Sequence, residues 1–285
     1  MSGILGVIGG SGLYGMEDLK NVRQVVVRTP FGDPSDALVV GELEGRTVAF
    51  LPRHGRGHRI SPSRINYRAN IYAMKKIGVD ALLSISAVGS MKEAIRPGDV
   101  VVVDQFYDNT RSRESTFFSD GLAAHIAFAD PVCPALSAVA ARAARKVVRR
   151  VHRRGTYLCI EGPAFSTRAE SNIYRKWGVD VIGMTNMPEA KLAREAELCY
   201  ATLALATDYD CWHETEGNVS VDAILAVLSR NVENSRKIVR ETAKLLPLPG
   251  KCGCGEAMKQ AVLTERKAIP APARKRLSLL LGKYL

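Results

Sequence analysis

Short apolar runs alternate with longer stretches in which apolar residues recur every three or four positions, from the start of the chain to about position 246. The short runs have the length of buried strands, and the longer stretches have the spacing of amphipathic helices. Strands are predicted at 3–9, 79–90, 98–106, 156–162, 179–185 and 199–207, and a β-hairpin at 37–51. Helices are predicted at 64–76, 134–149, 167–178, 187–198 and 219–246.

This alternation predicts an α/β fold, a single three-layer domain whose mixed, mostly parallel central sheet is flanked by helices. The sheet is mixed because the two strands of a hairpin are antiparallel. The sequence "PLPG" at 247–250 ends the last helix. We therefore place the domain at 1–250 and expect the tail at 251–285 to pack on it through a short helix. A chain of 285 residues, 46% of them hydrophobic, can bury a sizeable core.

The chain carries 40 Lys and Arg against 29 Asp and Glu, a net charge of +11 that favours anionic partners. Much of the excess lies at 141–154 and 273–277. No aromatic residues interrupt the first of these runs to stack on bases, so a solvated helix face and a basic tail are favoured over a nucleic-acid surface. A nucleic-acid or anionic-surface binder is kept as an alternative, and its affinity would fall steeply with salt.

The start of the chain has no basic segment followed by a long apolar core, and no apolar run approaches the roughly 20 residues of a membrane span. We therefore expect a cytoplasmic protein with no membrane partner.

The cysteines are an even set of six, at positions 133, 159, 199, 211, 252 and 254, the last two in "KCGCG". A zinc site would need a second close pair of Cys or His, which the sequence lacks, so no metal is expected. Structural disulfides and buried free thiols are both open, because cytosolic disulfides are rare outside hyperthermophiles.

A glycine-rich turn follows the first predicted strand, with Gly10, Gly12 and Gly15 in the spacing GxGxxG. A dinucleotide site would also need a helix directly after this turn and an acidic residue about 20 positions later. The sequence continues instead into "TPFGDPSD" and the hairpin, so dinucleotide binding is a minor alternative. The backbone N–H groups of the turn and the Ser11 hydroxyl can still hold a phosphate oxygen.

Candidate ligand-binding residues lie at or just beyond the ends of several predicted strands, at the carboxyl ends where open α/β sheets bind ligands. These candidates are Arg53, His54, Ser86, Ala87, Phe165, Ser166, Met184, Thr185, Asp208 and Asp210. A guanidinium beside an imidazole, as at Arg53 and His54, suits an oxyanion such as phosphate. The sequence contains no nucleophile elbow, Walker loop or metal-ligand cluster, so the chemistry is expected to rest on positioning and electrostatics.

The two acids of "ATDYD", Asp208 and Asp210, follow an apolar run and are one residue apart. Side chains alternate faces along an extended chain, which would place both carboxylates on the same side. Their mutual repulsion would keep a proton on one of them near neutral pH. Such a pair can act as a general acid.

Several longer motifs occur in order between about residues 3 and 246: "IGGSGL", "TPFGDPSDAL", "RHGRGH", "NYRANI", "GSMKEAIRPGD", "IEGPAFSTRAES", "MTNMPEAKLAREAELCYA" and "ATDYDCW". They resemble the methylthioadenosine-cleaving branch of the trimeric purine nucleoside phosphorylase family. The resemblance implies cleavage of 5′-methylthioadenosine by inorganic phosphate, a co-substrate, to adenine and 5-methylthioribose 1-phosphate. It implies purine and methionine salvage and no cofactor. A broader phosphorylase acting on adenosine, inosine, guanosine or methylthioinosine is the alternative, because "TNMPEA" departs from the "TTVPE"-like form of some members.

The family's functional residues carry over to matching positions of this chain. Those implied to hold phosphate are Ser11, Arg53, His54, Ser86, Ala87 and Thr185. Met184 would contact the ribose, and Phe165 and Ser166 would contact the base. Asp208 would protonate N7 of the purine, and Asp210 would accept a hydrogen bond from the 6-amino group.

The resemblance also implies a homotrimer, or a hexamer built from two trimers. An apolar pocket for the methylthio group would be formed by Val221, Ile224 and Leu225, with His58 and His125 coming from a neighbouring subunit. "KCGCG" is similar to the disulfide-bearing archaeal members, which implies disulfides and a thermophilic source.

Overall fold

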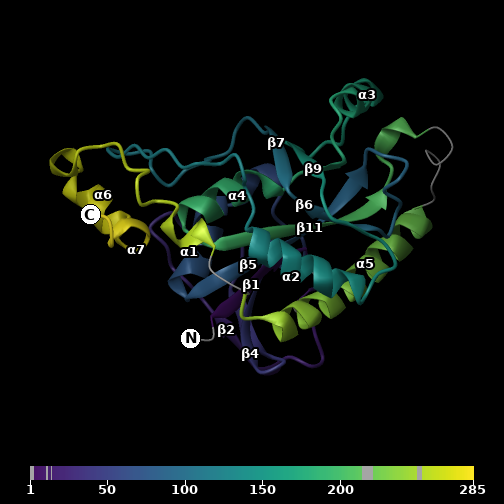
Figure 1. Ribbon diagram of the computed structural model, residues 1–285, viewed down its shortest axis with the longest axis horizontal. Coiled ribbons are helices and arrows are strands. Elements are labelled where there is room, and N and C mark those ends of the chain that lie inside the picture. Colours follow the sequence, from purple (N-terminus) through teal and green to yellow (C-terminus); the bar gives the residue numbers. More distant parts are fainter. Residues whose placement is uncertain (1–2, 11, 14, 214–220, 249–251) are drawn as a thin grey trace.

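The computed structural model describes residues 3–10, 12–13, 15–213, 221–248 and 252–285, and the side chains of 221–226 lie outside that description. An 11-stranded mixed sheet forms its centre (Figure 1). The strands are β1 (Ile4–Gly9), β2 (Lys20–Val25), β3 (Leu38–Leu43), β4 (Arg46–Pro52), β5 (Val79–Ser90), β6 (Val100–Val103), β7 (Gln105–Asn109), β8 (Val151–His152), β9 (Thr156–Ile160), β10 (Val181–Gly183) and β11 (Cys199–Asp208). Their main order is β2-β3-β4-β1-β5-β10-β9-β7, and β11, β6 and β8 branch from β5.

Helices cover both faces of the sheet and give the molecule three layers (Figure 1). They are α1 (Tyr67–Lys76), α2 (Pro134–Arg145), α3 (Arg168–Lys176), α4 (Asn186–Glu195), α5 (Val221–Leu245), α6 (Ala271–Arg276) and α7 (Ser278–Leu281). α2 and α5 pack on one face through a core that includes Leu136 and Ile238. α1, α4 and the tail pack on the other face, where the core includes Ile71, Leu192 and Leu277.

Strand β5 organises the edge of the sheet at which ligands are expected. It runs parallel to β1 on one side and to β11 on the other, and β4 runs parallel to β1. Its last residues, Gly89 and Ser90, pair antiparallel with β10, so the chain that leaves β10 runs back along β5. The carboxyl ends of β4, β1, β5 and β11 therefore meet at one edge, the usual place for ligands in open α/β sheets.

The predicted fold class is confirmed, with differences at a few elements. The strand predicted at 98–106 is two strands, β6 and β7, which separate at Asp104; its carboxylate accepts a hydrogen bond from Gly155 N–H at 2.9 Å. α2 ends at Arg145 rather than 149, because the backbone of Lys146 turns back to donate to Ala143 O and Ala144 O. The unpredicted β2 is an exposed edge strand with no buried face to give an apolar pattern.

The tail contains α6, α7 and short 3₁₀ turns rather than one helix, and its residue Leu277 lies in the same core as Ile71 and Leu192. An isolated bridge joins Val262 of the tail to Ala124, in the loop before α2. None of the helices in the described part of the chain has the length and apolar character needed to cross a membrane.

Candidate active site

A cavity of about 350 Å³ opens at the ligand edge of the sheet. It brings together most of the predicted site residues: Arg53, His54, His58, Ser86, Ala87, Phe165, Ser166, Met184, Thr185, Asp208 and Asp210. Apolar residues that were not predicted complete its walls: Ile85, Val88, Ile160, Ile182 and Leu228. Residues from widely separated parts of the sequence thus share one site.

Other predicted residues lie elsewhere. His125 is exposed on the loop beside the tail, where its backbone N–H donates to Ala261 O at 2.8 Å, and it does not line the cavity. Ser11 and the side chains of Val221, Ile224 and Leu225 lie outside the described residues.

His58 differs from its expected position. It lines the cavity of its own chain, whereas the resemblance implied that it comes from a neighbouring subunit. The turn after β4 folds the His58 ring onto His54, with ring centroids 4.2 Å apart and planes 17° from parallel.

Arg53 follows β4 and is held by Glu189 of α4. Its Nε and Nη2 donate to the two carboxylate oxygens at 2.8 and 3.0 Å, and its Nη1 donates to Ile85 O at 3.0 Å. The two side chains are only 2% and 1% exposed. Burial alone lowers the pKa of Arg53, but the Glu189 carboxylate outweighs it and the net pKa lies above the usual arginine value. The guanidinium is therefore permanently charged, rigidly oriented and already paired.

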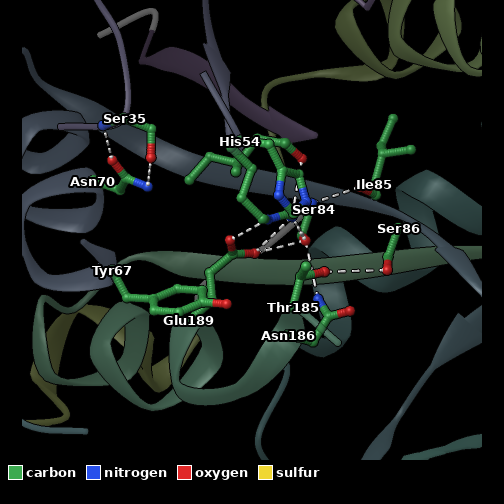
Figure 2. Close-up of polar contacts among 12 residues, drawn as sticks. Ser35, His54, Tyr67, Asn70, Ser84, Ile85, Ser86, Thr185, Asn186 and Glu189 are labelled. Carbon is green, nitrogen blue, oxygen red and sulfur yellow. Dashed lines mark hydrogen bonds and ion pairs between the residues drawn. The ribbon is translucent and has the colours of Figure 1, made fainter. Parts of the chain in front are cut away.

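A buried polar network supports this ion pair (Figure 2). Ser84 Oγ and Tyr200 OH donate to Glu189 Oε1 at 2.7 and 2.9 Å. Asn186 Nδ2 donates in turn to Ser84 Oγ and Tyr200 OH at 3.0 and 2.7 Å. Asn186, at which "TNMPEA" departs from the "TTVPE"-like form, is thus a fully buried amide whose hydrogen bonds hold the groups that bind Glu189. It does not line the cavity.

His54 is an uncharged part of the site at neutral pH. Its Nδ1 lies 2.9 Å from Ile60 O, so Nδ1 carries the ring proton and Nε2 is left as an acceptor. Burial lowers the pKa of His54 to about 4. The imidazole offers hydrogen bonding but no cation, so the positive charge at this edge is smaller than the sequence suggested.

Hydroxyl groups from separate strands meet next to Arg53. Ser86 Oγ lies 3.3 Å from Thr185 Oγ1 (Figure 2), and Tyr157 OH lies 3.1 Å from Ser86 Oγ. Ser86 lies within β5, before its last residues, and Thr185 follows β10. The two meet because β10 runs antiparallel to the end of β5.

A β-bulge carries Asp208 into the cavity. The register of β11 against β5 shifts between Ala206 and Asp208, so Thr207 is an extra residue that opposes no partner. Thr207 Oγ1 lies 3.1 Å from Val88 O and 2.5 Å from Asp208 Oδ2, within donating distance of both. The bulge and this hydroxyl together fix the direction of the Asp208 carboxylate.

Asp210 reaches the same cavity by a turn. It begins a 3₁₀ turn, Asp210–Trp212, with φ at +52°, and its backbone N–H donates to Asp208 Oδ1 at 2.8 Å. The two acids do line the same cavity, as predicted, but strand alternation is not the cause, because the strand ends at Asp208. Aspartate tolerates this left-handed conformation better than most residues.

The environment of Asp210 favours its protonated form. Burial, followed by the charge of Asp208, raises the pKa of Asp210, although Ser171 Oγ of α3 opposes this by donating to Asp210 Oδ2 at 2.5 Å. Gly89 allows the acids to pack this closely, because a Cβ there would lie 3.1 Å from Asp208 Oδ1 and 3.3 Å from Asp210 Cβ.

The remaining predicted residues lie where β9 and β10 end. Arg113, 1% exposed in its side chain, donates to Met184 O and Glu161 O, both at 2.7 Å, and joins the two strand ends. Phe165 is 84% exposed at the cavity. Ser166 Oγ is buried without a hydrogen-bond partner in the described part of the protein, so it is available to a ligand.

Three supporting residues were missed from the sequence: Glu189, Ser171 and Arg113. Glu189 had a usable signal, since it occupies the same helical stripe as Leu192, Ala193 and Ala196, where an acid implies a buried partner. Ser171 and Arg113 carried none, because each acts through a residue distant in sequence.

The chain is similar to known phosphorylases in sequence and in overall fold. The model of the Phosphorylase superfamily matches residues 4–244. The chain is 57% identical over 286 residues to the S-methyl-5′-thioadenosine phosphorylase of Geobacter sulfurreducens, covering 100% of both. A crystal structure of a methylthioadenosine phosphorylase from an antarctic soil metagenomic library is similar, with a TM-score of 0.93, 49% identity, and coverage of 99% of this chain and 100% of that one. A variant of the adenosine/methylthioadenosine phosphorylase of Schistosoma mansoni, in complex with adenine, has a TM-score of 0.79, 39% identity, and coverage of 85% and 91%.

Proposed function

This chain belongs to the phosphorylase superfamily, and from that premise we propose that it cleaves 5′-methylthioadenosine with inorganic phosphate. The products are adenine and 5-methylthioribose 1-phosphate, which makes it a pentosyltransferase. Full-length relatives named for this activity support the proposal. The observation that carries it is the acid pair, Asp208 and Asp210, lining the same cavity as Arg53 and the hydroxyls of Ser86 and Thr185.

Phosphate binds at the hydroxyl end of this cavity. The hydroxyls of Ser86 and Thr185 and an N–H of Arg53 offer donors to its oxygens, and Ser11, His54 and Ala87 are assigned to the same group. One phosphate oxygen attacks C1′ of the sugar as the bond from C1′ to N9 breaks. Because these donors are already oriented, little reorganisation is needed when the oxocarbenium-like sugar forms.

The electron pair of the broken bond goes to the purine, which is neutralised by a proton at N7. The acid pair holds that proton and donates it, while the second carboxylate accepts from the 6-amino group. The sequence assigned the N7 proton to Asp208. The raised pKa of Asp210 instead favours Asp210 as the residue that holds the proton before the purine binds.

The acid pair also selects the base. A 6-oxopurine presents an acceptor where adenine presents a donor, so a carboxylate there would lose its partner. Rejection of a substrate with the wrong polar edge can reach about 10⁴-fold. A specific observation keeps adenosine as a second substrate: a similar structure is named for both adenosine and methylthioadenosine.

The proposal extends to the surroundings of the site. Met184 packs on the ribose, and Phe165 and Ser166 contact the base. Val221, Ile224 and Leu225 form the methylthio pocket, which His125 of a neighbouring subunit completes in a homotrimer or hexamer. The reaction uses phosphate as co-substrate and no cofactor, and it serves purine and methionine salvage in the cytoplasm.

The direct test is release of free base from methylthioadenosine, adenosine and inosine, each with and without phosphate. We expect phosphate-dependent release of adenine, fastest from methylthioadenosine, and poor release of hypoxanthine from inosine. Inosine as the best substrate would overturn the role of the acid pair in selecting 6-aminopurines. Base release that does not depend on phosphate would overturn phosphorolysis itself.

A further inference from the structure

Four of the six cysteines gather at one point, far from the cavity. The Sγ atoms of Cys133, Cys199, Cys252 and Cys254 all lie within 4.8 Å of one another, and those of Cys199 and Cys252 are 3.2 Å apart. All four are free thiols. They come from three separate segments: the residue before α2, the first residue of β11, and the start of the tail.

The arrangement matches the coordination of a single soft metal ion. Sulfurs held about 2.3 Å from a tetrahedral zinc ion lie roughly 3.8 Å from one another. The sulfurs of this cluster, all within 4.8 Å of one another, are close enough to surround one such ion. Four thiolates in a compact tetrahedral set select zinc among the common divalent ions. We propose that Cys133, Cys199, Cys252 and Cys254 bind one Zn²⁺ as a closed tetrathiolate site.

The spacing argument against a metal fails here for a clear reason. "KCGCG" supplies one close pair, and the fold supplies the other two ligands from positions 66 residues apart in sequence, 133 and 199. Cys133 is brought beside β11 because its backbone N–H donates to Tyr200 O at 2.7 Å. Cys133 is also the N-cap residue of α2, where the positive end of the helix dipole favours a thiolate.

The position of the cluster indicates a structural site. Cys199 begins β11 and Asp208 ends it, so the metal and the acid pair are about 30 Å apart along the strand. Four protein ligands leave no open position for substrate, as in structural zinc sites generally. Binding converts each remaining thiol to a thiolate and releases its proton to solvent.

The metal would fix the tail to the domain. The tail already meets the domain near β11 through Glu197, whose carboxylate accepts from Met258 N–H at 3.0 Å and Tyr284 OH at 2.6 Å and pairs with Lys283 at 2.6 Å. Beyond this point the tail runs beside the loop that carries His125, where Leu263 N–H donates to Ala123 O at 3.0 Å. The cysteine cluster lies at the start of the tail, and a bound metal would attach its first residues to the domain.

The full-length protein, purified without chelators, tests this by elemental mass spectrometry. We expect one zinc per chain, retained against a chromophoric chelator of moderate affinity. Replacement by Co²⁺ should give the visible absorption of a tetrahedral cobalt tetrathiolate, a readout that is independent of catalysis. The double variant Cys252→Ser/Cys254→Ser should lose the metal, and Cys211→Ser, outside the cluster, should keep it.

The test does not depend on folding of the double variant, because the metal content and cobalt spectrum of the wild-type protein are sufficient alone. The proposal also predicts that a strong chelator makes the tail of the wild-type protein susceptible to protease. Two results with the wild-type protein overturn it: no uptake of metal by the reduced, zinc-supplemented protein, or a mass and peptide map that show these four cysteines joined as disulfides. Zinc retained equally by Cys211→Ser and by the double variant would also exclude this site.

Discussion

At the scale of single residues, the acids of the cavity are distinguished by what surrounds them. Asp208 accepts hydrogen bonds at both carboxylate oxygens, from Asp210 N–H and from the Thr207 hydroxyl. Asp210 is more dependent on one neighbour, Ser171, and burial raises its pKa. One acid is thus held as an acceptor and the other as a proton carrier, which makes their separate replacement informative.

Asparagine in place of either acid should slow turnover while preserving phosphate binding. Asparagine keeps the size of the side chain and tolerates the left-handed conformation of Asp210. At position 210 it cannot carry a proton to N7, and at position 208 it replaces the carboxylate that accepts from the 6-amino group. We expect Asp208→Asn and Asp210→Asn to lower kcat by about 10²- to 10⁴-fold, the usual worth of general acid catalysis. Steady-state kinetics with methylthioadenosine would measure it, and near-normal kcat in both variants would refute the acid role of the pair.

Removal of Ser171 should move the alkaline limit of activity. The Ser171 hydrogen bond lowers the pKa of Asp210, so Ser171→Ala should raise that pKa and shift the alkaline limb of kcat to higher pH. Asp208→Asn should shift the limb of its residual activity the other way, because it removes the charge that raises the pKa of Asp210. Unmoved limbs in both pH profiles would show that Asp210 is not the titrating acid.

At the scale of secondary structure, the long elements could be predicted because each has a buried face and therefore an apolar pattern. β5 and β11 were predicted almost to the residue, whereas β2 has no buried face and left no pattern. The candidate site was predictable as a set of strand ends. Its bulge at Thr207 and its turn at Asp210 were not, because both arise from pairing with β5 and α3, which single-sequence periodicity does not record.

Glu195, the last residue of α4, makes the stability of the fold depend on pH. Its carboxylate is 4% exposed and accepts from Phe117 N–H at 2.8 Å and Thr116 Oγ1 at 2.7 Å, and burial raises its pKa from 4.5 to about 7. The folded protein therefore binds this proton more tightly than the unfolded chain. Raising the pH from about 5 to about 8 should weaken folding by up to roughly 3 kcal/mol through this group.

Glu195→Gln should remove that contribution. Denaturant unfolding at both pH values would show a smaller loss of stability in the variant than in the wild type. The exposed Glu114→Gln is the matched control and should leave the pH dependence unchanged. Equal pH dependence in all three proteins would contradict the raised pKa of Glu195.

At the scale of the whole molecule, the C-terminal tail lies beside the loop that carries His125. The tail reaches the loop of His125, which is exposed and does not line its own cavity. That separation is what the proposed oligomer requires, because a residue exposed at one place can complete a neighbour's site. The net charge of +11 indicated an anionic ligand but did not identify it. The hydroxyls of Ser86 and Thr185 in the same cavity as Arg53 are the feature that favours phosphate.

Mixed oligomers would test whether His125 acts across an interface. His125→Ala and Asp208→Asn chains should each be impaired alone, but mixed trimers should regain about a third of their sites, those in which a wild-type Asp208 meets a neighbour's wild-type His125. Co-expression of the two chains with different tags, followed by assay of the doubly purified protein, measures this. Activity no higher than the sum of the separate variants would place His125 outside the neighbouring site.

The pairing of Arg53 with Glu189 has a consequence for the release of product. Among the described residues that line the cavity, Arg53 is the sole Lys or Arg, and its charge is already matched. An unpaired Lys or Arg would bind phosphate tightly, but it would bind the sugar phosphate product just as tightly. Under the proposed function, the hydroxyls and the neutralised guanidinium should bind that dianion less tightly than an unpaired cation would, so we expect weak inhibition by the sugar phosphate product.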